Sequence, residues 1–252
     1  MERKIGNYAK HAQYWDWSGH DRSTEQEYWL KFAKRYGKNV LIPMCALSET
    51  GAYMAEHDMY VTAFDITPEM ISEGRKRFGD VPGLRLLEGD ICDFSFDIPP
   101  ADFCFVVDFG HILTIEDIRR ALVCIHKHLR LGGCLAIGTG FRDPDDVESV
   151  HYPEKTFHPL KQIYPDLKVW KTGDSRKEGA TGRFYISQTF YAEDADGHIE
   201  SFDHSFYLQS YTREAWLNAI KQSGFEIKKE HKGDEGTPWD DDGWYVLEAI
   251  KI

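Results

Sequence analysis

Acidic residues at the ends of short apolar runs are the part of this sequence best suited to bind a ligand. Asp65 ends the run Val-Thr-Ala-Phe, Asp90 follows Leu-Arg-Leu-Leu-Glu-Gly, and Asp108 ends Phe-Cys-Phe-Val-Val. Runs of this kind are typical of strands buried on both faces of a parallel sheet. Parallel strands end at one edge of an α/β sheet, and acids at those ends build a nucleoside pocket.

This pattern resembles the class I S-adenosylmethionine-dependent methyltransferases. In that family an acid ending the second strand holds both ribose hydroxyls, and Asp65 has that position. The next helix opens with a small residue, Pro and an acid, as Thr67-Pro-Glu does here. After the third strand an acid meets the adenine amine and an apolar residue lies under the ring, which corresponds to Asp90 and Ile91.

The resemblance covers residues 39–140 and continues in the last helix and strands. A Gly132-Gly133 turn leads into the fifth strand, as in the family. Residues 211–216 and 224–227 correspond to the family's last helix and sixth strand. The resemblance implies S-adenosylmethionine as cofactor, with contacts from Tyr14, Met44, Cys45, Ala46, Asp65, Ile66, Asp90, Ile91, Asp108 and Phe109.

The loop after the first strand departs from the family pattern. The family has acid-x-Gly-x-Gly-x-Gly, whereas the aligned residues are Ile42-Pro-Met-Cys-Ala-Leu-Ser48. Glycines there let the backbone pass close to the ligand and adopt unusual φ and ψ angles. Ala46 and Ser48 are small enough for a close approach, but Met44 is bulky and Pro43 lacks an amide donor. Two hypotheses follow: an altered pocket for the methionine end, or a protein that kept the fold and lost the cofactor.

Charge and composition exclude several classes of partner. The formal net charge of −12 argues against a nucleic-acid backbone, which needs clustered Lys and Arg. The 5 Cys include no Cys-x-x-Cys pair, which predicts reduced thiols and no zinc site. Residues 1–20 are polar and aromatic, and no apolar run approaches the length of a membrane span. We expect a cytoplasmic protein with no metal, nucleic-acid or membrane partner; a homodimer is left open.

Four segments are expected along the 252 residues. They are a helical cover (1–38), the cofactor-binding core (39–140), a substrate-side insert (141–210), and the last helix and two strands (211–252). The expected core strands are Asn39–Pro43, Val61–Asp65, Leu84–Glu88, Phe103–Asp108 and Cys134–Thr139. The expected core helices are Glu49–Glu56, Pro68–Phe78 and Glu116–His128. This alternation predicts an α/β fold, a Rossmann-like doubly wound sheet of seven strands with the last antiparallel, plus a small antiparallel β insert.

The cover and the insert are the candidates for the ligand-facing parts. In the cover, Tyr8, Tyr14 and Trp15 are candidate lid residues; the alternative is a helix that only packs on the sheet. In the insert, 141–174 reads as loop, and two alternating runs (182–191 and 199–208) flank an Asp-Gly turn, which predicts a hairpin.

Arg183, Tyr185 and His204 of the hairpin are candidate substrate contacts for a small polar acceptor. Alternation places Arg183, Tyr185, Ser187 and Thr189 on one face of the strand. A hairpin inserted here resembles the branch of the family that methylates small amines, including amino sugars.

His111 is the candidate catalytic residue. It follows the fourth strand and should face the cleft, where an imidazole that titrates near neutrality can act as a base or orient the acceptor. The leading function is methyl transfer from S-adenosylmethionine to a small molecule at nitrogen or oxygen, by in-line displacement. The alternatives are a non-catalytic protein with this fold, and third, another nucleotide-dependent α/β enzyme.

Overall fold

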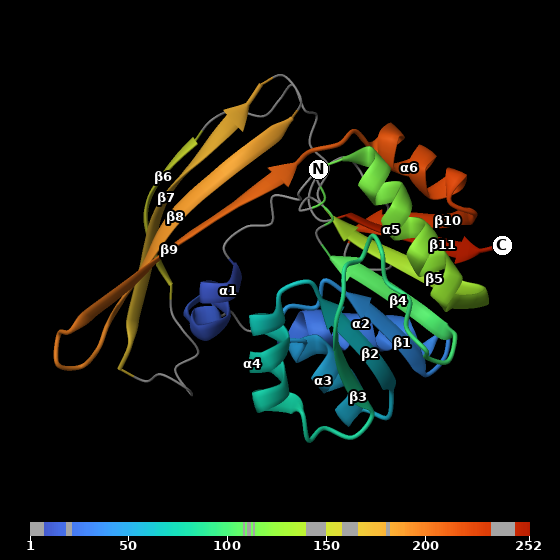
Figure 1. Ribbon diagram of the computed structural model, residues 1–252, viewed down its shortest axis with the longest axis horizontal. Helices are drawn as coiled ribbons and strands as arrows, with labels where there is room; N and C mark the ends of the chain where they lie inside the picture. The colour runs from blue at the N-terminus through green and yellow to red at the C-terminus, as the bar shows by residue number, and fades with distance from the viewer. Residues whose placement is uncertain are drawn as a thin grey trace.

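A mixed seven-stranded sheet, called the central sheet below, is the larger of the two sheets of the molecule (Figure 1). The computed structural model describes residues 8–18, 22–107, 109, 112, 114–139, 150–157, 166–179, 182–232 and 245–252. In spatial order the strands are β10 (Phe225–Lys232), β11 (Tyr245–Lys251), β5 (Leu129–Thr139), β4 (Ala101–Val107), β1 (Asn39–Pro43), β2 (Tyr60–Asp65) and β3 (Leu84–Glu88). β11 is antiparallel to both neighbours and the other pairs are parallel, which confirms the predicted sheet.

Helices cover both faces of this sheet. Helices α2 (Ser23–Lys34) and α3 (Glu49–Glu56) pack on one face, and α5 (Ile115–His128) and α6 (Arg213–Gln222) on the other. Alternate residues of each strand enter the two cores, as in β1, where Leu41 joins one core and Val40 the other. Helix α4 (Pro68–Phe78) packs along β2 and β3. Among the described helices, none has both the length and the apolar character needed to cross a bilayer.

A second, antiparallel sheet stands beside the first (Figure 1). Its strands lie in chain order: β6 (Val150–Phe157), β7 (Lys168–Glu178), β8 (Arg183–Glu193) and β9 (Ile199–Gln209). The predicted β8–β9 hairpin is confirmed, and Gly197 in its turn has a φ of 80°. The prediction of a loop over 141–174 is wrong for β6 and the start of β7. Pro153 suggested a loop, but β6 is an edge strand, and its register with β7 shifts between Tyr152 and Lys155, where an edge strand tolerates proline.

The N-terminal segment lies between the second sheet and the central domain. It consists of α1 (Tyr8–His11) and η1 (Ala12–Ser18), and it contacts both β9 and α4 (Figure 1). On the α4 side, Ala12 packs with the fully buried Leu47 and with Met70. The segment therefore connects the insert to the loop that follows β1.

A buried carboxylate joins the residues that follow α2 to the antiparallel edge of the central sheet. Glu248 of β11 is 4% exposed; it lies 3.0 Å from Nε2 of His231 on β10 and accepts a hydrogen bond from the hydroxyl of Tyr36 at 3.0 Å. Burial opposes ionisation of Glu248, but these two hydrogen bonds and the nearby Arg35 outweigh burial and lower the pKa of the carboxyl. Glu248 therefore acts as a charged anchor for three elements.

We expect Glu248→Ala to reduce the free energy of unfolding by about 3 kcal/mol at pH 7, because it leaves buried donors without their acceptor. The contribution of a carboxylate with a lowered pKa is complete above the ordinary value of 4.5 and is lost as the pH falls through the lowered folded value. Denaturant unfolding at several pH values measures both effects. Glu226→Ala, which removes an exposed pair with Lys228, is the control and should cost less than about 1 kcal/mol. Equal losses from the two variants would contradict the anchor.

Candidate functional site

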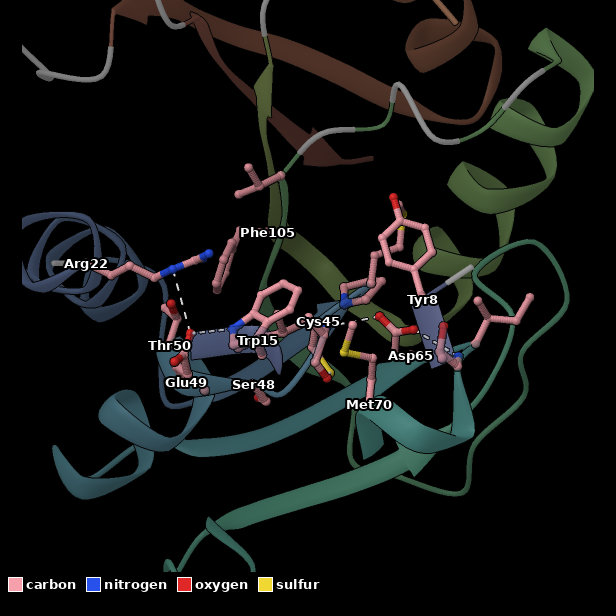
Figure 2. Close-up of a pocket in the computed structure, with 18 of the residues that line it drawn as sticks. Tyr8, Trp15, Arg22, Cys45, Ser48, Glu49, Thr50, Asp65, Met70 and Phe105 are labelled. Carbon is pink, nitrogen blue, oxygen red and sulfur yellow. Dashed lines mark hydrogen bonds and ion pairs between the residues drawn. The ribbon is translucent and has the colours of Figure 1, made fainter. Parts of the chain in front are cut away.

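A cavity of about 340 Å³ opens at the carboxyl ends of β1, β2 and β4. Its size falls in the range of small-molecule sites, roughly 300–1,000 Å³. Figure 2 shows Tyr8, Trp15 and Asp65 around this space. The lining residues are Tyr8, Trp15, Arg22, Glu25, Ile42, Pro43, Met44, Cys45, Ala46, Ser48, Glu49, Thr50, Gly51, Asp65, Ile66, Thr67, Met70, Phe105 and Val107.

Asp65 is held at the cavity by the backbone on both sides of it. Its Oδ2 accepts the amide of Ala46 at 3.0 Å, and its Oδ1 accepts the amide of Thr67 at 2.9 Å. A carboxylate can accept about four hydrogen bonds, enough for both amides and the two hydroxyls of a ribose. Burial and the Asp65 carboxylate raise the pKa of the Cys45 thiol well above its usual range, so this thiol stays protonated and is a poor nucleophile.

The loop after β1 keeps left-handed backbone angles without glycine. Met44, Ala46 and Ser48 have φ values of 54°, 49° and 67°. These three positions align with the glycines of the family that the sequence resembles. Left-handed angles cost a residue with a side chain roughly 1–2 kcal/mol relative to right-handed ones. The loop therefore has the backbone shape that glycines normally permit, in a strained form.

The N-terminal segment closes one side of the cavity. Nε1 of Trp15 donates a hydrogen bond to Oε2 of Glu49 at 3.2 Å, and the Arg22 guanidinium lies 5.6 Å from the ring of Trp15 (Figure 2). Nε of Arg22 is 3.6 Å from the same Glu49 oxygen. These contacts fix an aromatic ring over the first turn of α3.

A buried aromatic cluster fixes the same segment to the second sheet. The ring of His11 lies 4.3 Å from that of His204, and Tyr8 packs edge-on against His204 at 4.9 Å. Burial, helped by Lys171, lowers the pKa of His11 to about 4. His11 is therefore neutral at physiological pH, as an apolar cluster requires.

The structure places only some of the residues expected to bind the cofactor at the cavity. Five of them line the cavity: Met44, Cys45, Ala46, Asp65 and Ile66. Tyr14 instead stacks on Phe202 at 4.6 Å and donates a short hydrogen bond to Glu200, so it faces the second sheet.

The other expected cofactor contacts that the structure describes, Asp90, Ile91 and Phe109, lie apart from the cavity lining. Oδ1 of Asp90 accepts the amide of Cys92 at 2.9 Å, and Ile91 is 6% exposed in the α5–α6 core. Phe109 is fully buried against Trp216. Asp108 and His111 lie outside the described residues.

The three expected substrate contacts occupy two faces of the second sheet. Gln188 pairs with His204 in the β8–β9 register, and His204 is 2% exposed beneath α1. Arg183 and Tyr185 have the opposite parity on β8, as the alternation predicts, and they face away from α1. Tyr185 pairs with Tyr207, with their rings 5.1 Å apart. A single roof made of all three side chains is therefore not what the structure shows.

Sequence reasoning missed the charged residues at the cavity rim. Arg22, Glu25 and Glu49 line the cavity, although only Glu49 had a detectable signal, as the first helical residue after the loop. Arg22 precedes α2, and its approach to Trp15 depends on tertiary packing that no local pattern encodes.

We expect Ala46→Gly to increase the free energy of unfolding by about 0.5–1 kcal/mol, because glycine adopts a positive φ without strain. Chemical denaturation measures the change. The same substitution at Ala52, a buried residue in the middle of α3, is the control and should reduce stability by about 1 kcal/mol or more. Destabilisation by Ala46→Gly would mean that residue 46 does not have a left-handed conformation in solution.

Comparison with known proteins places this fold. A family model described as a methyltransferase domain matches residues 40–133. An amino pentose methyltransferase from Micromonospora echinaspora is 18% identical, with a TM-score of 0.73 over 96% of this chain and 97% of its own. An S-adenosylmethionine-dependent methyltransferase from Clostridium acetobutylicum is 14% identical, with a TM-score of 0.77 over 97% of this chain and 98% of its own.

A sugar N-methyltransferase from Streptoalloteichus is 16% identical, with a TM-score of 0.73 over 100% of this chain and 95% of its own. Comparison with curated protein sequences gives no match. Residues 40–133 therefore match a methyltransferase domain, and the fold of the chain is that of S-adenosylmethionine-dependent methyltransferases.

Proposed function

We propose that the chain transfers a methyl group from S-adenosylmethionine to a small-molecule acceptor, at a nitrogen or an oxygen, by in-line displacement. The observation that carries this proposal is Asp65, which is anchored to Ala46 and Thr67 at a cavity of suitable size. In this role Asp65 would accept the two ribose hydroxyls, while the loop from Met44 to Ser48 passes beneath the methionine end.

The charges around the cavity support a cationic ligand. Among the described lining residues, Glu25, Glu49 and Asp65 are acidic and Arg22 is basic. When bound, S-adenosylmethionine supplies a methyl group activated by a positive sulfur and carries an ammonium group at its methionine end. An acidic, partly aromatic cavity stabilises such charges. The same cavity favours the cofactor over the neutral-sulfur product.

The acceptor is proposed to be a small amine or hydroxyl compound, with amino sugars as the first class to test. Two of the similar structures are an amino pentose methyltransferase and a sugar N-methyltransferase. In this chain, His111 would take the proton released by the acceptor or orient its lone pair. Arg183, Tyr185 and His204 are retained as candidate acceptor contacts, although they lie on two faces of the second sheet.

A protein that kept the fold and lost the cofactor is the second candidate. It rested on the missing glycines, but the left-handed angles at Met44, Ala46 and Ser48 argue that the loop retains a ligand-binding shape. Another nucleotide-dependent enzyme is a weaker candidate, because a pyrophosphate needs free backbone amides in the loop before the helix. Pro43 has no amide N–H, the amide of Ala46 donates to Asp65, and the amide of Ser48 donates to the carbonyl of Cys45.

We expect the chain to bind S-adenosylhomocysteine and Asp65→Asn to weaken this binding at least tenfold. The substitution removes charge-assisted hydrogen bonds, each contributing roughly 1.5–3 kcal/mol before water compensates. Isothermal calorimetry measures both affinities. Asp93→Asn, at an exposed position, is the matched control and should bind like the wild type. Absence of binding by the wild type at millimolar ligand would favour the non-catalytic alternative.

We expect His111→Ala to reduce turnover and to flatten the pH–rate profile near neutrality, because an imidazole base titrates there. Turnover is measured with the best acceptor from a panel of amino sugars, and the affinity for S-adenosylhomocysteine should stay within twofold. His198→Ala, in the exposed β8–β9 turn, is the control. Unchanged turnover would show that the reaction relies on positioning alone.

A further inference from the structure

The loop from Met44 to Ser48 is packed between two helices. Leu47, at its centre, is fully buried with Met70 of α4. Ser48 precedes α3, and its amide donates to the carbonyl of Cys45 at 2.8 Å. The loop therefore has little room to move between α3 and α4.

Helix α4 comes close to the backbone of this loop at Gly74. A Cβ at residue 74 would lie 2.6 Å from the carbonyl oxygen of Leu47 and 3.3 Å from its carbonyl carbon. A carbonyl oxygen cannot rotate away alone; the peptide between Leu47 and Ser48 must turn with it. A side chain at residue 74 would therefore displace either this peptide or the backbone of α4.

The position of Gly74 also opposes the preferences of a helix. It lies in the interior of α4, where glycine is the poorest helix former after proline. An alanine at residue 74 should strengthen the isolated helix. The glycine is explained by the contact with Leu47 and not by the helix itself.

Helix α3 makes a similar accommodation on the other side. A Cβ at Gly51 would overlap Oγ of Ser48. Glycines of both neighbouring helices therefore leave room for atoms of the loop.

We propose that Gly74 is a positioning residue of the cofactor loop: by leaving room for the carbonyl of Leu47, it sets the backbone shape of residues 44–48. The proposal rests on the proposed function only for its ligand measurement. The proposal predicts that the backbone shape of residues 44–48 and the ligand affinity change together when residue 74 acquires a Cβ.

The test compares Gly74→Ala with the wild type well below the unfolding temperature. We expect amide hydrogen exchange over residues 44–48 to accelerate and the dissociation constant for S-adenosylhomocysteine to rise at least tenfold. Gly133→Ala is the matched control, because its Cβ would meet the carbonyl oxygen of Arg130 at 2.9 Å, at the amino end of β5. It should lower the unfolding temperature without changing exchange at 44–48 or the dissociation constant.

A second variant separates the loop from general destabilisation. Ser48→Gly added to Gly74→Ala frees φ of residue 48, so the Leu47 peptide can turn, and both measurements should recover. If Gly74→Ala alone fails to fold, folding and binding by the double variant support the proposal, and failure of both overturns it. Unchanged exchange and affinity in Gly74→Ala also overturn it. If the wild type does not bind S-adenosylhomocysteine, the proposed function fails, and hydrogen exchange alone decides the role of Gly74.

Discussion

One carboxylate that accepts two backbone amides organises the ligand site. Asp65 ends β2 and binds the amides of Ala46 and Thr67, which belong to different loops. Helix α3 begins just after the first loop, and α4 begins just after Thr67. A single side chain therefore sets the starts of both helices, and the cavity walls follow from them. Buried amides without such an acceptor would destabilise the fold itself.

Regular periodicity made most of the central domain predictable from the sequence. The bounds of Asn39–Pro43, Leu84–Glu88, Glu49–Glu56 and Pro68–Phe78 agree with the structure, because apolar spacing and helix-start residues all indicate the same elements. Strands β6 and β7 were missed in part because prolines suggested a loop. The structure places Pro153 at a register shift of an edge strand, a context that depends on which strand lies beside it.

The site was predictable only where it depends on strand ends. Asp65 at the end of β2 and the loop that follows β1 both line the cavity as expected, since β1 and β2 end side by side. Which of Tyr8, Tyr14 and Trp15 faces the cavity was not predictable, because a short irregular helix between two surfaces has no fixed periodicity. The loop's left-handed angles were also hidden, because Met44, Ala46 and Ser48 give no local sign of a positive φ.

The placement of the N-terminal segment has a consequence for the order in which the protein forms. Tyr14 is synthesised well before its partner Glu200, which lies 186 positions later in the chain. At 5–20 residues per second, this separation corresponds to roughly 10–40 s of translation. Contacts so distant in sequence are slow to close and form late. The cavity is therefore completed only after the β8–β9 hairpin has formed, because the aromatic residues of the N-terminal segment pack on that hairpin.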